Sequence, residues 1–109
     1  AFAFAVRVIR LCQHLDGSPG VSRTVSKQLL RSGTSIGANL EEARAGQSKA
    51  DFISKNAIAL KEARETLYWL RLLTAANLMS ESRVVELTAE AEELARILAA
   101  IIVSAKSSP

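Results

Sequence analysis

Residues 49–77, KADFISKNAIALKEARETLYWLRLLTAAN, contain neither glycine nor proline, and we expect them to form one long helix. At about 1.5 Å per residue, this helix spans about 45 Å and is the longest element of the chain. One of its faces carries mostly apolar side chains at the three- and four-residue steps of a bundle core. These residues are Phe52, Ala59, Leu60, Ala63, Leu67, Leu70 and Thr74. The stretch therefore predicts the central helix of a helical bundle.

Three other segments show the same helical periodicity. Residues 2–15 form the first, which ends at a turn rich in glycine and proline. Residues 21–46 form an amphipathic helix whose interior glycines, Gly33 and Gly37, indicate close backbone approach or a bend. Residues 81–106 carry a heptad-like apolar seam. The chain is therefore expected to contain four helices, the third being residues 49–77.

Short links between these helices predict the topology. A short link makes consecutive helices antiparallel, so we expect an all-α fold, an antiparallel up-down-up-down four-helix bundle. At 109 residues, the chain has the size of one domain, residues 1–109. Ser48, three residues before Asp51, is expected to cap the third helix. The abrupt apolar start at Ala1 suggests a first helix that was once longer.

The content of cysteine and histidine narrows the possible classes of site. Cys12 is the only cysteine and His14 the only histidine, so an internal disulfide is impossible and a zinc site would depend on carboxylates. We therefore expect no metal, no cofactor and a reducing, cytoplasmic setting. No window approaches the ~18 uncharged residues of a membrane span, and we expect no membrane partner.

The sequence also lacks the residue patterns of helical enzymes, and we expect no enzymatic activity. Di-iron bundles need Glu-x-x-His pairs, but His14 has no acidic residue three positions before it. Ser-His-Asp and phosphate-loop patterns are missing as well. A helical nuclease is a third interpretation of function, because Arg10 and His14 loosely match the Arg-His spacing of helical RNA-cleaving domains.

Two parts of the chain resemble a known bacterial family. Residues 35–43, SIGANLEEA, followed by Phe52 and by residues 61–70, KEARETLYWL, resemble the four-helix-bundle family named for 23S ribosomal RNA intervening sequences. Ala43 stands where many members have glycine, and the first helix looks shorter than usual. The resemblance implies a ring-like homo-oligomer, commonly a pentamer. It also implies two candidate partners, nucleic acid and a reverse transcriptase, because relatives that serve diversity-generating retroelements have both.

A second stripe on the third helix suggests a subunit interface. It comprises Ile58, Glu62, Glu65, Trp69 and Leu72, at helical spacing beside the core stripe. On a monomer these side chains would leave a large apolar patch, which subunit contact would cover. The alternative is a bundle wide enough to bury both stripes.

A polar line runs along the second helix. Arg31, Ser35, Asn39 and Glu42 follow one another at steps of four, four and three. One interpretation is a binding strip. The other, which we favour, is a structural network in which Ser35, Asn39 and Glu42 set the register between helices. In this network Asn39 and Glu42 each bond to a partner on a neighbouring helix, such as Asn56, Glu62 or a backbone group.

Two rows of cationic residues suggest a surface for nucleic acid. Arg23, Lys27 and Arg31 form the row on the second helix, and Lys61, Arg64, Tyr68 and Arg71 form the row on the third. Such rows suit successive phosphates, and a tyrosine between cations can stack on an unpaired base. The alternative is a solvated helix face, since the net charge of +3 is a mild excess.

These observations favour a non-enzymatic, self-assembling helical scaffold or adaptor that binds RNA or DNA through its basic helix faces. The alternative is a purely structural homo-oligomer that has no nucleic-acid partner.

Overall fold

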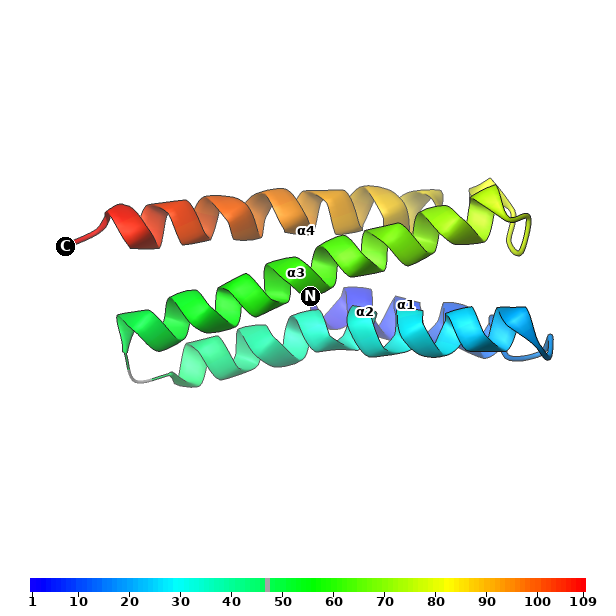
Figure 1. The fold of residues 1–109 in the computed structure, drawn as a ribbon, viewed down its shortest axis with the longest axis horizontal. Coiled ribbons are helices and arrows are strands. Elements are labelled where there is room, and N and C mark those ends of the chain that lie inside the picture. Colours follow the sequence, from blue (N-terminus) through cyan, green and yellow to red (C-terminus); the bar gives the residue numbers. More distant parts are fainter. Residues whose placement is uncertain (47) are drawn as a thin grey trace.

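The computed structural model describes residues 1–46 and 48–109 (Figure 1). In order, the helices are α1 (Phe2–Leu15), α2 (Val21–Ala45), α3 (Lys49–Ala75) and α4 (Glu81–Ser107). These ranges contain four helices and no strand, which confirms the predicted all-α class. The molecule is a rod of 50 × 20 × 20 Å. The predicted helix ends differ from the observed ends by at most two residues.

Consecutive helices double back along the rod (Figure 1). Arg31 of α2 pairs with Glu62 of α3. Glu42 lies later in α2 and pairs with Lys55, which lies earlier in α3, so residue numbers increase along α2 in the direction in which they decrease along α3. These two helices are therefore antiparallel. α3 packs against both α2 and α4, while α1 packs mainly against α2 and touches α4 only lightly. The order of helices around the bundle is thus the order along the chain.

Local sequence signals fix the helix ends. The Ser48 side chain accepts a hydrogen bond of 3.0 Å from the backbone N–H of Asp51, which confirms the predicted cap of α3. At the other end, Asn77 takes a left-handed conformation with φ of 60°. The N–H of Leu78 then bonds to the carbonyl of Leu73, the pattern of a Schellman motif. Because asparagine tolerates this conformation, α3 ends at Ala75, two residues before the predicted end.

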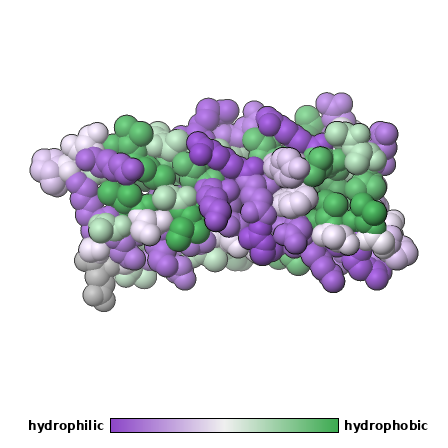
Figure 2. Space-filling view, in the orientation of Figure 1, coloured by the Kyte–Doolittle hydropathy of each residue, from purple (hydrophilic) through white to green (hydrophobic). Residues whose placement is uncertain are grey.

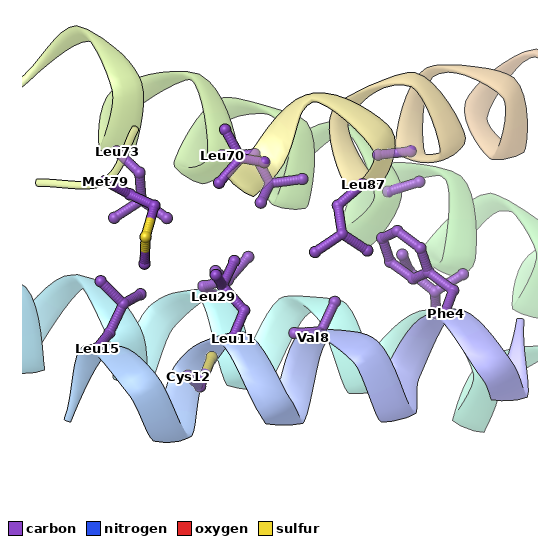
Figure 3. Packing of buried hydrophobic residues seen from close by; sticks show 14 of the residues in the cluster. Phe4, Val8, Leu11, Cys12, Leu15, Leu29, Leu70, Leu73, Met79 and Leu87 are labelled. Carbon is purple, nitrogen blue, oxygen red and sulfur yellow. The ribbon is translucent and has the colours of Figure 1, made fainter. Parts of the chain in front are cut away.

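The hydrophobic core receives side chains from every helix, as Figure 3 shows. Its largest fully buried apolar members are Phe4, Val8, Leu29, Ile36, Leu70, Leu73, Val84 and Leu98. Met79, from the link between α3 and α4, is buried in the same cluster. The face of α3 predicted to line the core therefore does so at its centre, where Ala59, Ala63 and Leu70 are fully buried.

α1 is much shorter than its neighbours. It has 14 residues, against 25 in α2 and 27 in both α3 and α4. Ala1, which directly precedes α1, lies beside Gly37, near the middle of α2 (Figure 1). The bundle therefore has four helices over one part of the rod and three over the rest.

A close contact between the Val8 side chain and the backbone of α2 at Gly33 seats α1 on α2. A side chain at Gly33 would place a Cβ only 2.7 Å from Cγ1 of Val8, so glycine is required at this position. Nearby, the Ser26 hydroxyl donates to the Cys12 carbonyl at 3.3 Å, and the Cys12 thiol donates to the Ser26 carbonyl at 3.5 Å. The interior glycine predicted to mark close approach does so at Gly33.

We expect Gly33→Ala to lower the free energy of unfolding, because the clash with Val8 costs about 1–3 kcal/mol, whereas the gain in helix propensity is about 1 kcal/mol. Gly37→Ala is the matched control. Its Cβ would meet Ala1 at an ordinary 3.8 Å, so this variant should be as stable as the parent or more stable. Thermal unfolding monitored by circular dichroism measures both. Equal stabilisation by the two substitutions would contradict the close packing at Gly33.

Candidate binding surfaces

An ion cluster joins α2 to α3 near the middle of the rod. Arg31 lies 3.1 Å from Glu62 Oε2 and also pairs with Glu65. Glu65 in turn accepts a hydrogen bond of 3.0 Å from the Trp69 indole N–H. We call Arg31, Glu62, Glu65 and Trp69 the seam cluster. It links one cation on α2 with two carboxylates and an indole on α3.

The seam cluster changes the electrostatics of its members. The hydrogen bond from Trp69 is the main cause that lowers the pKa of Glu65 below its usual range, and Arg31 adds to it. The same contacts, led by the hydrogen bond to Glu65, raise the pKa of Arg31. Glu62 is only 7% exposed and depends on Arg31 for its counter-charge. The charged forms of Glu65 and Arg31 are thus favoured in the folded chain.

The predicted subunit stripe on α3 lies largely within this α2–α3 contact. Glu62 is buried inside the monomer, and Glu65, Trp69 and Leu72 are half-buried. Only Ile58, 39% exposed, is open to solvent. The expectation of a large free apolar patch on this stripe is therefore wrong, because a cation from α2 lies over it and pairs with its two carboxylates.

The predicted polar line on α2 divides into two kinds of contact. Its ends bridge to α3, through Arg31 in the seam cluster and through Glu42, which lies 3.2 Å from Lys55. Its middle bonds to its own helix instead. The Ser35 hydroxyl donates to the carbonyl of Arg31, and the Asn39 amide donates to the carbonyl of Ser35. The expected partner on a neighbouring helix is thus wrong for Asn39, which bonds within α2, whereas Glu42 does pair across to α3, with Lys55 and not with Asn56 or Glu62.

A buried hydroxyl pair at the same level escaped the sequence reasoning. Thr66 donates to Ser32 Oγ at 2.9 Å, and both residues are fully buried between α2 and α3. The only signal in the sequence is that Ser32 interrupts the apolar stripe of α2 at a core position. A buried hydroxyl needs a polar partner, and Ser32 finds one on its own helix, the carbonyl of Leu29, as well as Thr66 across the interface.

The cationic row of α3 faces solvent. Lys61, Arg64, Tyr68 and Arg71 are all exposed, and Tyr68 is 57% exposed. Its ring meets the Trp69 ring edge-on, with centroids 5.3 Å apart. Figure 2 shows hydrophilic side chains gathered across the middle of this face of the rod.

The row of α2 is less uniform. Arg23 donates to the carbonyl of Asp16 at 3.2 Å, and Lys27 is exposed. Arg31 turns toward α3 and is held by Glu62 and Glu65, so it is not a free cation of the predicted surface. The structure therefore brings the α3 row together on one face but separates Arg31 from its row.

Two apolar hollows lie on the surface of the bundle, and the sequence did not predict either. One, of about 570 Å³, is lined by Phe52 of α3 and by Ile97, Ala100, Ile101, Ser104, Ala105 and Ser108 of the α4 side. The other, of about 650 Å³, lies between the start of α1 and α2, and includes Phe2, Ile9 and Leu40. We call the first hollow the open-end hollow. It marks the flank of α4 beyond the reach of α1.

The structure describes residues 1–46 and 48–109, and within them it offers no metal site and no membrane span. No group of three or more histidine, cysteine or acidic residues in these ranges could hold a metal ion. None of their helices is long and apolar enough to cross a membrane. His14 is exposed near the end of α1, and Cys12 is buried, which raises the pKa of its thiol.

The lowered pKa of Glu65 predicts a loss of stability in acid. Its charged form contributes stability above the pKa of the unfolded chain, and this contribution is lost as pH falls through the lower pKa of the folded chain. Because the pair is partly exposed, the contribution is about 1 kcal/mol or less. We therefore expect Glu65→Gln to be less stable than the parent at pH 7, with the difference shrinking as the pH falls below the usual pKa of glutamate, about 4.3. A difference in melting temperature that persists unchanged down to pH 3 would contradict this assignment.

Comparison with known proteins agrees with this architecture. The sequence profile of the 23S rRNA-intervening sequence protein family matches residues 1–100. A crystal structure of a protein of unknown function from the S23 ribosomal protein family of Bacteroides thetaiotaomicron superposes with a TM-score of 0.85. The two sequences are 45% identical, and the match covers 93% of each chain. No curated protein matches the chain significantly. The chain belongs to the 23S rRNA-intervening sequence protein family.

Proposed function

We propose that this protein is a non-enzymatic helical scaffold that assembles with copies of itself and binds RNA or DNA on its outer face. The observation that carries the proposal is the character of the outer surface. α3 presents a row of exposed cations, and α4 lines an apolar hollow together with Phe52. A chain built in this way offers surfaces for contact. The single buried cysteine fits the cytoplasmic setting that we expect.

Self-assembly would cover the open-end hollow. Ile97 is 47% exposed and lines this hollow together with Phe52 and Ile101. Burying apolar surface stabilises an interface by about 25 cal/mol per Å², and contiguous exposed apolar patches commonly mark such contacts. A cyclic arrangement in which each subunit covers the hollow of the next is consistent with the pentamer implied by the family resemblance.

We expect Ile97→Glu to shift the protein toward smaller species, because a charge in the hollow would be buried without a partner on assembly. Val103→Glu is the matched control, since Val103 is a 66% exposed β-branched residue of the same helix that does not line the hollow. Size-exclusion chromatography with light scattering measures the mass. A monomeric parent at micromolar concentration, or equal dissociation by both variants, would rule out this interface.

The outer face of α3 supports binding to nucleic acid. Lys61 and Arg64 make no ion pair within the described part of the chain, and Arg71 lies 3.9 Å from Glu92, a loose contact. Tyr68 is exposed between these cations, where a base stacked on its ring would contribute about 1–3 kcal/mol. Assembly would repeat this face around a ring, so weak contacts would combine into stronger binding.

We expect the double variant Lys61→Gln/Arg64→Gln to bind single-stranded RNA or DNA more weakly and with a shallower salt dependence. Each lost phosphate contact lowers the salt slope by about 0.7 on a single strand. Arg96→Gln/Lys106→Gln removes the same charge from α4 and is the control. Fluorescence anisotropy at several salt concentrations measures both. Equal loss of binding in the two variants would show that total charge, not the α3 face, is responsible.

The second candidate function is a purely structural homo-oligomer. It is favoured by the same open-end hollow, which needs no nucleic acid. If the parent protein forms oligomers but shows no salt-sensitive binding to RNA or DNA, the purely structural homo-oligomer replaces the nucleic-acid-binding scaffold.

A further inference from the structure

We propose that a hollow between α1 and α4 binds a phosphate monoester carried on a hydroxyl-bearing sugar. This hollow has a volume of about 270 Å³. Arg7, Arg10 and His14 of α1 line it on one side, and Arg83 of α4 lines it on the other. It is separate from the outer face of α3 and from the open-end hollow, so the inference does not rest on either proposed activity.

The topology brings these side chains together. Arg7, Arg10 and His14 follow one another at steps of three and four on α1, so they share one face of that helix. Arg83 lies in the first turn of α4, which antiparallel packing brings alongside the end of α1. Because α1 and α4 touch only lightly, a space stays open between them.

The donors of this hollow are suited to phosphate. A guanidinium presents five N–H donors in a planar fork that matches two phosphate oxygens at once. Arg7 is held in place by Glu90 at 3.1 Å, whereas Arg10 and Arg83 make no ion pair in the part of the chain that the structure describes. These two arginines are therefore available to an anion that enters between the helices.

The floor of the hollow strengthens the attraction. Leu11 and Leu87 line it and are buried in the core, with 8% and 5% exposed. An apolar floor lowers the local dielectric constant, so the field of the arginines is screened less than on an open surface. A doubly charged monoester gains more from this field than a singly charged diester.

One acidic residue at the hollow selects the kind of molecule that carries the phosphate. Glu86 lines the same space and would repel a bare anion. Its carboxylate can accept hydrogen bonds from hydroxyl groups, however, so a sugar bearing the phosphate satisfies both the arginines and Glu86. Two sources share this chemistry: a free sugar phosphate or nucleotide, and the 5′-terminal phosphate of an RNA strand.

Isothermal titration calorimetry of the full chain with ribose 5-phosphate tests the proposal. We expect saturable binding with one ligand per chain, weakened about tenfold or more in Arg10→Gln/Arg83→Gln, because each lost charge-assisted hydrogen bond is a large part of such an affinity. Arg96→Gln, an exposed arginine of α4 outside the hollow, should bind as the parent does. Circular dichroism should show that all variants remain folded.

Glu86→Gln separates the two parts of the site. It should weaken the binding of ribose 5-phosphate while strengthening the binding of inorganic phosphate, because the repulsion and the hydroxyl acceptor are both reduced. No saturable binding of ribose 5-phosphate by the parent, or equal binding by the parent and Arg10→Gln/Arg83→Gln, would overturn the proposal. So would a Glu86→Gln variant that binds both probes as the parent does.

A second titration, with RNA oligonucleotides, distinguishes the two possible sources of the phosphate. A 5′-phosphorylated RNA oligonucleotide should bind more tightly than its 5′-hydroxyl counterpart if the RNA end is the ligand, and Arg10→Gln/Arg83→Gln should remove that preference. Equal binding of the two oligonucleotides, with ribose 5-phosphate still bound, assigns the site to a free sugar phosphate or nucleotide. Lys61→Gln/Arg64→Gln should keep its affinity for ribose 5-phosphate, so failure of the α3 face and failure of this site give different results.

Discussion

The pairing of α2 with α3 is the contact on which the rest of the structure depends. α1 packs mainly on α2, and α4 packs mainly on α3, so the α2–α3 register sets where both outer helices lie. Polar contacts at several levels specify that register: the Ser32–Thr66 hydroxyl pair, the seam cluster, and Glu42 with Lys55. A slip of one helical turn would break the bond between Ser32 and Thr66. It would also leave the buried Glu62 carboxylate without its counter-charge, which is strongly destabilising.

Two parts of the outer surface differ in character. Phe4 and Val8 of α1 fill the core, and Gly33 of α2 leaves room for the Val8 side chain. On α4, Ile97 and Ile101 line the apolar open-end hollow. On α3, Lys61 and Arg64 belong to an exposed cationic row. The bundle thus presents an apolar surface suited to copies of the chain and a polar surface suited to an anionic partner.

The sequence predicted the elements of the fold well, because their signals are local. Ser48 caps α3 by accepting a hydrogen bond from Asp51, only three residues further along the chain. Gly33 marks a close contact that any helix packed on this face of α2 would need. The missed features depend on residues distant in the chain. Glu62 looks like a surface acid on its own helix and is buried only because Arg31 comes from α2 to neutralise it. The open-end hollow and the hollow between α1 and α4 depend on where α1 lies against the other helices, and periodicity along one helix carries no such information.

A double-mutant cycle across the seam cluster tests the central claim, that charge pairing between α2 and α3 sets the register. The cycle compares the free energy of unfolding of the parent with those of Arg31→Met, Glu62→Gln and the double variant. Because Glu62 is buried beside Arg31, the account predicts a coupling of about 1 kcal/mol or more, with the double variant less destabilised than the sum of the single changes. Single changes that add to within about 0.3 kcal/mol would contradict it.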